Sequence, residues 1–168
     1  MVVIIWGVSG AGKTTVGKLL AHELDWKFIE ADDFHSPSNI EKMRRGVPLT
    51  DEDRQPWLER LRAAIERSLA ANENAVLACS ALKKKYRDEL RVNEQVKFVF
   101  LRGSREQIAE RIRHRRGHFF DPNLLESQFA DLEEPTANED VLIVDLGHSP
   151  AEIVETIKRK LELRKQTG

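Results

Sequence analysis

The sequence has few of the features that place a protein outside a reducing compartment or in a membrane. Its 168 residues include one cysteine, Cys79, which excludes an internal disulfide and fits a reducing compartment. No apolar run approaches the ~20 residues that span a bilayer. The short apolar run at the N-terminus leads directly into a glycine-rich motif that a signal peptide could not contain. These absences predict a cytoplasmic protein.

The chain also lacks an excess of either charge. Lys and Arg total 27 and Asp and Glu total 28, which gives a net charge of −1. This balance provides no global attraction to nucleic acid or to an anionic membrane, so neither is an expected partner. Internal repeats and low-complexity segments are missing as well. Hydrophobic residues make up 40% and charged residues 33% of the chain, which is typical of one soluble globular domain with a real core.

The most informative segment that is present is Gly7–Thr14, which fits the phosphate-loop pattern G-x-x-x-x-G-K-[ST]. The apolar run 2–6 before it predicts a buried parallel strand, and the apolar spacing over 15–24 predicts a helix. Glycines let backbone N–H groups face phosphate oxygens, and the helix N-terminus adds positive potential. We therefore expect a nucleoside triphosphate here, with Lys13 at its β- and γ-phosphates and Thr14 holding Mg²⁺. The expected nucleotide-binding residues of this segment are Gly7, Ser9, Gly10, Ala11, Gly12, Lys13, Thr14 and Thr15.

The remaining chain alternates between strand and helix patterns. Further strands are predicted over 26–30, 75–79, 96–101 and 141–144, with helices between them and one after the last. This alternation predicts a three-layer α/β/α fold with a five-stranded parallel sheet. We expect one domain, 1–168, with a substrate-binding insertion at 33–56 and a lid at about 115–121. Residues 36–38 are interpreted as a break before a helix over 39–45, and Pro56 leaves the start of the following helix open.

Carboxylates are expected where the second strand ends. Asp32, Asp33 and His35 follow that strand at the C-terminal edge of the sheet, where open α/β sheets bind ligands. The third strand ends in Cys79 and Ser80 without an acidic residue, so Asp32 is the best-placed carboxylate near Mg²⁺. Asp145 also follows an apolar strand, but its place near the C-terminus makes a metal role there the weaker interpretation.

Three reaction classes use such a phosphate loop: small-molecule kinases, GTPase-like switches, and ATP-driven motors or nucleic-acid enzymes. The compact chain leaves room for a lid and a substrate pocket, which favours a small kinase. Arg111 and Arg115 share a helix face beside the break at 117–120, and cations there can stabilise a migrating phosphoryl group. Arg105 and Arg113 are expected to be solvent-exposed instead, paired with Glu106 and Glu110. Residues 117–120, G-H-F-F, fit a closing lid that excludes water.

Three blocks identify the family that the chain resembles. They are H-x-x-x-N-I-E-K-M from His35, C-S-A-L-K-K-x-Y-R-D from Cys79, and R-x-G-H-F-F from Arg115. Over about residues 3–160 the chain resembles the gluconokinases, small phosphate-loop relatives of shikimate and nucleoside-monophosphate kinases. The resemblance implies Mg²⁺-dependent transfer of the γ-phosphoryl group of ATP to the 6-hydroxyl of D-gluconate. A kinase of another small hydroxy acid, such as shikimate, is the alternative, and an adaptor without turnover is a more distant one.

The resemblance also implies residue roles. Asp32 would orient or deprotonate the 6-hydroxyl and hold a Mg²⁺-bound water, with Asp33 as helper or bystander. Arg111 would lie on the adenine side, and Arg115 would be the lid arginine that meets phosphate. A homodimer is implied by the resemblance alone. The expected catalytic residues are Lys13, Asp32 and Arg115, and the expected substrate-binding residues are Asp32, His35, Arg54, Lys83, Arg87, His118 and Gln128, with Arg54, Lys83 and Arg87 as alternatives for the carboxylate.

Overall fold

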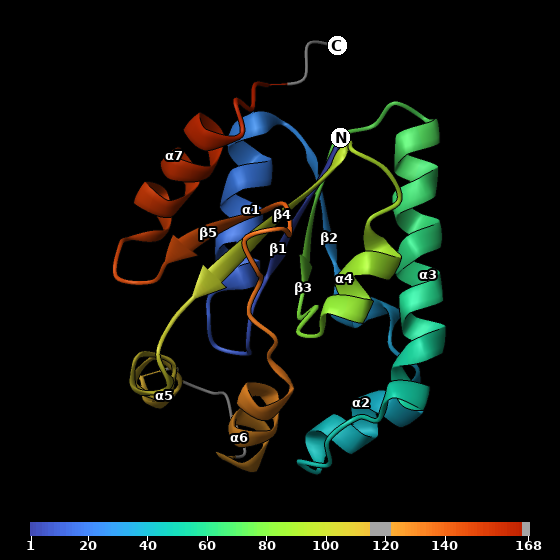
Figure 1. Ribbon diagram of the computed structural model, residues 1–168, viewed down its shortest axis with the longest axis vertical. Coiled ribbons are helices and arrows are strands. Elements are labelled where there is room, and N and C mark those ends of the chain that lie inside the picture. Colours follow the sequence, from blue (N-terminus) through green and yellow to red (C-terminus); the bar gives the residue numbers. More distant parts are fainter. Residues whose placement is uncertain (115–121, 166–168) are drawn as a thin grey trace.

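The computed structural model describes residues 1–114 and 122–165 and contains one parallel sheet (Figure 1). The strand order is β2-β3-β1-β4-β5, so the strand that enters the phosphate loop lies at the centre. All neighbouring strands pair in parallel, which confirms the predicted fold class. The strands are β1 (Val2–Trp6), β2 (Lys27–Glu30), β3 (Ala75–Cys79), β4 (Val96–Arg102) and β5 (Val141–Asp145).

Strands β1 and β3 are apolar throughout because helices cover both faces of the sheet. Every residue of β1 and β3 is buried. Val3 and Ile5 of β1 pack into one core cluster, with residues of α1 (Lys13–Leu24) and α7 (Pro150–Lys160). Val2 and Ile4 point to the opposite face, toward α3 (Asp51–Ala70) and α4 (Lys84–Leu90). Figure 1 shows these two helix pairs on opposite sides of the sheet.

The first turn of α3 resolves the helix start that Pro56 left open. Thr50 is the cap: its side chain accepts from the Asp53 N–H, and the Asp53 carboxylate accepts from the Thr50 N–H. This reciprocal capping box starts the helix at Asp51, so Pro56 lies inside it. The helix therefore starts at its cap, and the proline does not set its first residue.

Three further helices lie beyond the C-terminal ends of the strands (Figure 1). They are α2 (Pro37–Arg44), α5 (Arg105–Arg113) and α6 (Pro122–Asp131), and a 3₁₀ turn (Ala31–Phe34) connects β2 to α2. The interpretation of residues 36–38 as a break was wrong. Ser36 Oγ accepts from the Asn39 N–H, and Pro37 takes the first helical position, where a missing N–H is harmless. The helix therefore begins two residues before the predicted position.

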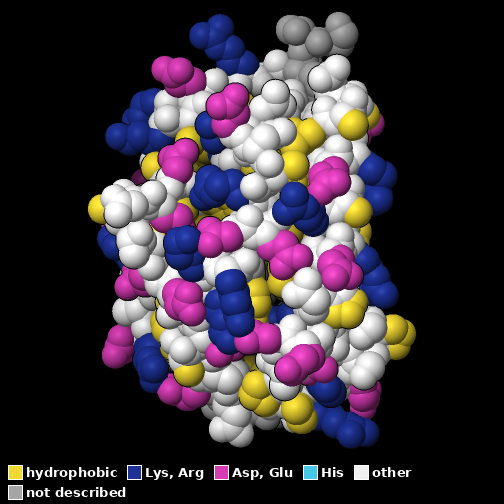
Figure 2. All heavy atoms as spheres, turned by 45° about the vertical axis from the view of Figure 1, so that its right-hand side comes forward, with side chains coloured by type: hydrophobic (Ala, Val, Ile, Leu, Met, Phe, Trp, Pro, Cys, Tyr) yellow, Lys and Arg dark blue, Asp and Glu magenta, His cyan; other side chains and the backbone are white. Residues whose placement is uncertain are grey.

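The surface carries no broad region of one charge on the face shown in Figure 2. There Lys and Arg side chains alternate with Asp and Glu side chains over the whole visible face. This mixture agrees with the near-zero net charge of the sequence. Within residues 1–114 and 122–165, no helix is both long and apolar enough to cross a membrane. The lid predicted at 115–121 lies outside the described residues.

Candidate active site

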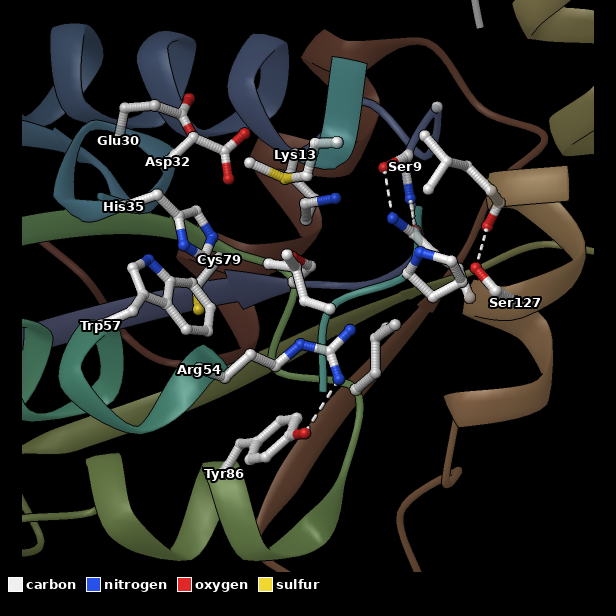
Figure 3. A pocket seen from close by; sticks show the side chains of 18 of the residues that line it. Ser9, Lys13, Glu30, Asp32, His35, Arg54, Trp57, Cys79, Tyr86 and Ser127 are labelled. Carbon is white, nitrogen blue, oxygen red and sulfur yellow. Dashed lines mark hydrogen bonds between the residues drawn. The ribbon is translucent and has the colours of Figure 1, made fainter. Parts of the chain in front are cut away.

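A cavity opens at the C-terminal ends of β1, β2 and β3, where the sequence predicted the ligand edge. Figure 3 shows Glu30, Asp32 and His35 on one side of it and Ser9 on the other. Five of the predicted phosphate-loop residues line this cavity, while Gly7, Ala11 and Thr15 do not. The loop residues that line it are Ser9, Gly10, Gly12, Lys13 and Thr14.

The phosphate loop has the backbone that its glycines predict. Gly10 and Gly12 adopt φ values of 87° and 90°, a left-handed conformation that disfavours any side chain. Helix α5 covers this turn closely, since a Cβ on Gly10 would lie 3.0 Å from Ile112 Cγ1. A Cβ on Gly12 would lie 3.4 Å from Nη1 of Arg111. The guanidinium of Arg111 therefore lies next to the phosphate loop, while its predicted place on the adenine side stays a prediction.

Lys13 and Thr14 begin α1 at the positive end of the helix. Lys13 Nζ donates to the Val8 carbonyl at 3.0 Å, which folds the side chain back over the loop. Thr14 Oγ1 donates to Glu30 Oε2 at 2.6 Å. The sequence interpretation missed Glu30. The same sheet-edge argument that selected Asp32 applies to it, because Glu30 is the last residue of β2.

The residues here fit the requirements of Mg²⁺. Thr14 and Glu30 already bring a hydroxyl and a carboxylate together, and Asp32 lines the same cavity. Hard divalent cations prefer such oxygen ligands, and Mg²⁺ typically takes only one or two carboxylates in addition to substrate phosphates and waters. Among the described residues there is no group of three or more His, Cys, Asp or Glu that could hold a metal. A magnesium ion here would therefore need phosphate oxygens to complete its coordination.

His35 forms a rigid, nearly buried wall of the cavity. It is 8% exposed, and its ring stacks on Trp57 with centroids 4.4 Å apart and an interplanar angle of 9°. Trp57 Nε1 donates to the Ala31 carbonyl at 2.8 Å, which holds the stack against the turn after β2. Burial lowers the pKa of His35, with Asp32 raising it and Arg54 lowering it further. The imidazole is consequently neutral at neutral pH.

Arg54 supplies a cation at a second position in the cavity. Figure 3 shows its guanidinium pointing into the cavity from α3. Nη1 donates to the Tyr86 hydroxyl at 2.9 Å, and Nη2 donates to Asp131 Oδ2 at 3.3 Å. Burial and the hydrogen bond to Asp51 raise the pKa of Tyr86 to about 12, so the phenol keeps its proton. Among the described lining residues, Lys13 and Arg54 are the only lysine or arginine side chains.

The structure argues against Arg87, one of the three predicted alternatives for the partner of the substrate carboxylate. Its side chain is 1% exposed and does not line the cavity. Nε donates to Glu139 at 3.0 Å, Nη1 donates to the carbonyls of Ala81 and Leu82, and Nη2 donates to the Glu133 carbonyl. These internal partners occupy the guanidinium. Arg87 therefore holds two loops together near the cavity instead of contacting a ligand.

Lys83 also lies outside the lining. Its amino group donates to Asp51 Oδ1 at 3.1 Å, within the cluster that includes Tyr86. Of the three alternatives for a substrate carboxylate, the structure thus brings only Arg54 into the cavity with Asp32 and His35.

Gln128 of α6 lines the cavity but is bonded to the phosphate loop. Its Oε1 accepts from the Ser9 N–H at 2.5 Å, and its Nε2 donates to Ser9 Oγ at 2.8 Å. Nothing in the sequence signals this contact, since 119 residues separate the partners. Its predicted role in binding the substrate stays a prediction. Arg115 and His118 lie outside the described residues.

The other acidic and basic candidates near the sheet edge are surface residues. Asp145 pairs with Arg102 at 2.9 Å, at the ends of the neighbouring strands β5 and β4. Neither residue lines the cavity, which agrees with the preference for Asp32 over Asp145 as the carboxylate near Mg²⁺. Arg113 pairs with Glu110 at 3.5 Å, as predicted. The predicted partner of Arg105 was wrong: Arg105 binds Glu126 of α6 at 2.6 Å. This bridge joins the helices on either side of residues 115–121.

Comparisons with known proteins agree with this geometry. A family model described as shikimate kinase matches residues 9–162. The thermosensitive gluconokinase of Escherichia coli K12 is 46% identical, over 93% of this chain and 84% of that protein. A solved gluconokinase from Sinorhizobium meliloti superposes with a TM-score of 0.81 at 43% identity, covering 95% and 94% of the two chains. The shikimate kinase of Aquifex aeolicus, at 21% identity, a TM-score of 0.60 and 96% of each chain, shares the fold.

Proposed function

Because the chain belongs to the gluconokinase family, we propose that it transfers the γ-phosphoryl group of ATP to the 6-hydroxyl of D-gluconate. The products are 6-phospho-D-gluconate and ADP. The bond between the γ-phosphorus and its bridging oxygen breaks, and a bond from the 6-oxygen to the same phosphorus forms. The hydroxyl proton leaves with a base. The transfer is direct and in line, without a phosphoenzyme.

One observation carries this proposal: a phosphate loop, a carboxylate and a second cation share one cavity. Lys13 lies at the donor end and Arg54 in the wall formed by α3, with Asp32 also lining the space. A kinase of a carboxylated polyol needs these three groups. Lys13 neutralises the donor phosphates, Asp32 receives or orients the attacking hydroxyl, and Arg54 binds the carboxylate of the acceptor.

Asp32 is the proposed base. It follows the strand end at the ligand edge and lines the same cavity as His35, a predicted substrate-binding residue. Asp33 points elsewhere, since it lines a separate groove beside β2 and α3 rather than this cavity. We therefore propose that Asp32 accepts the proton of the 6-hydroxyl and that Asp33 takes no part in the reaction.

The proposed magnesium site consists of Thr14 and Glu30, with Asp32 acting through a water. When bound, Mg²⁺ neutralises charge that develops on the transferring phosphoryl group. Thr14 and Glu30 are already in contact at 2.6 Å, so the chain itself holds the hydroxyl and the carboxylate in place. Arg111, beside Gly12, is proposed on the nucleotide side of the site.

Several features are proposed from the family resemblance. Residues 33–56 form the substrate-binding insertion and 115–121 the lid of a single domain, with Arg115 meeting phosphate and His118 the acceptor. Gln128 serves the acceptor hydroxyls once the nucleotide has displaced its contact with Ser9. The proposed compartment is the cytoplasm, which suits a chain with one buried cysteine, and the proposed assembly is a homodimer.

An ADP-release assay tests the function. The purified chain is supplied with ATP and Mg²⁺ and with D-gluconate, its stereoisomers, shikimate or nucleoside monophosphates in turn. We expect rapid release with D-gluconate and little with shikimate or the nucleoside monophosphates, because neither of these places a carboxylate and a primary hydroxyl at opposite ends of a flexible polyol. The stereoisomers share that arrangement, so slower release with them would show that the cavity also selects the configuration of the hydroxyls. Faster turnover with shikimate would replace the proposed acceptor by the alternative, and no release with any acceptor would indicate a nucleotide-binding adaptor.

A further inference from the structure

We propose that Asn39 is a positioning residue that keeps His35 neutral with its proton on Nε2, so that His35 donates a hydrogen bond to an acceptor hydroxyl. The identity of the acceptor rests on the proposed function, whereas the protonation of His35 does not. The proposal stands on two buried polar side chains: His35 is 8% and Asn39 is 5% exposed.

The orientation of the Asn39 amide is determined by its second partner. Asn39 Nδ2 lies 2.8 Å from the backbone carbonyl oxygen of Asp53, which can only accept. The atom at that position must therefore be the NH₂ nitrogen, because a flipped amide would place two acceptor oxygens against each other. Its other hydrogen is left for His35 Nδ1, at 3.2 Å.

The tautomer of His35 follows from this orientation. Because Nδ1 accepts from Asn39, it carries no proton, and a neutral imidazole must then carry its single proton on Nε2. The charged or titratable groups that face the ring are Asp32 from the turn after β2 and Arg54 from α3. The Asp53 carboxylate is bonded to Lys42 and to the Thr50 backbone, so it does not compete for Nδ1.

The backbone around Asn39 gives it this place. Ser36 caps α2 by accepting from the Asn39 N–H at 3.1 Å, which makes Asn39 the third helical residue. The carbonyl that it binds belongs to Asp53, whose side chain completes the capping box of α3. Asn39 thus joins the N-terminal turns of two helices at the point where His35 enters the cavity.

A neutral donor beside Asp32 has a specific use. A carboxylate can only accept and an Nε2–H group can only donate, whereas a hydroxyl can do both. A substrate hydroxyl beside Asp32 must therefore donate to it, and a hydroxyl beside His35 must accept from it. These opposite requirements favour one orientation of the bound polyol. A protonated imidazolium would instead pair with Asp32 and weaken it as a base.

Nitrogen NMR on the full chain labelled with ¹⁵N-histidine tests the tautomer directly. The chain has five histidines, and the His35→Gln variant identifies the signals of His35 by their loss. Near neutral pH we expect an unprotonated Nδ1 and a protonated Nε2 for His35. A proton on Nδ1, or an imidazolium signal, would overturn the proposal. This NMR measurement needs no substrate, so it tests the tautomer even if the proposed function is wrong.

Variants of Asn39 test its positioning role. Asn39→Asp replaces the donor by a carboxylate oxygen, which should raise the pKa of His35 and move a proton to Nδ1. We expect kcat/KM for D-gluconate to fall about tenfold, which corresponds to one hydrogen bond, while KM for ATP changes less than twofold. Asn93→Asp is the matched control, because it adds the same charge on an exposed turn.

Asn39→Ala separates positioning from folding. It removes the donor without adding charge, and the histidine signals should then show both tautomers in a chain with native circular dichroism. An unchanged His35 signal in both Asn39 variants would show that Asn39 does not set the tautomer and would refute the proposal.

Discussion

Replacing Arg54 by methionine should selectively weaken the reaction with a carboxylated acceptor. The Arg54 side chain is only 14% exposed. Methionine keeps the apolar stem of this side chain and removes the guanidinium. A hydrogen bond to a charged group contributes about 1.5–3 kcal/mol, and 1.36 kcal/mol is a factor of ten. In the free protein the guanidinium already donates to Tyr86 and Asp131. A hydrogen bond to the substrate carboxylate that replaces one of these bonds therefore contributes less than a newly formed one. We therefore expect kcat/KM for D-gluconate to fall roughly 10- to 30-fold, toward the lower end of that range.

The assay compares two acceptors and two proteins. D-Glucitol has the same polyol chain without the carboxylate, so its weak phosphorylation should be nearly unaffected by Arg54→Met. The two acceptors and the two proteins form a thermodynamic cycle. The difference between the two losses in kcat/KM gives the coupling free energy between the guanidinium and the carboxylate. Arg67→Met serves as the control on the same helix, because Arg67 is exposed in the last turn of α3 and does not line the cavity.

Two results would refute the reasoning about Arg54. Equal losses for both acceptors would show that the guanidinium organises the cavity instead of binding the carboxylate. A loss below threefold with D-gluconate would place the carboxylate elsewhere. Urea unfolding of each variant separates either result from a loss of folded protein.

Three further substitutions test the rest of the site. Lys13→Ala should lower kcat on the order of 10²–10³-fold, because a preorganised cation is lost; turnover within twofold of the wild type would reject its role. Asp32→Asn should lower kcat far more than it raises KM for ATP, and a larger loss in Asp33→Asn would show that the wrong carboxylate was chosen. Arg87→Met should lower the free energy of unfolding by about 3–5 kcal/mol in urea, because Glu139 is left buried and unpaired; a change below about 1 kcal/mol would contradict this.

Matched controls exist for two of these changes. Lys18→Ala removes a lysine from the same helix as Lys13, on the side that faces Phe28, and should leave kcat unchanged. Arg102→Met breaks the exposed pair with Asp145 and should change the free energy of unfolding by less than about 1 kcal/mol.

The parts of the fold that depend on local pattern could be predicted from the sequence. Apolar runs such as Val2–Trp6 and Ala75–Cys79 are strands because parallel strands are covered on both faces. The phosphate loop could be predicted because its glycines and the following helix are contiguous. Asp32 was placed correctly in the cavity because strand ends meet at one edge of the sheet.

The parts that depend on distant partners could not be predicted. Arg87 shares a motif block with cavity residues, but Glu139, 52 residues away, draws it into the interior. Gln128 meets Ser9 through the placement of α6, which no local pattern encodes. Glu30 could have been predicted by the strand-end argument, but its hydrogen bond to Thr14 depends on how closely β2 approaches α1.

Phosphorus NMR of the reaction products tests the central claim most directly. The chain is given ATP, Mg²⁺ and equal concentrations of D-gluconate and shikimate, and the products are identified by their phosphorus couplings and by mass. We expect 6-phospho-D-gluconate and ADP in equal amounts, with shikimate left unmodified. Phosphorylated shikimate as the main product, or a phosphate on a gluconate hydroxyl other than the sixth, would contradict the proposed placement of Asp32 and Arg54.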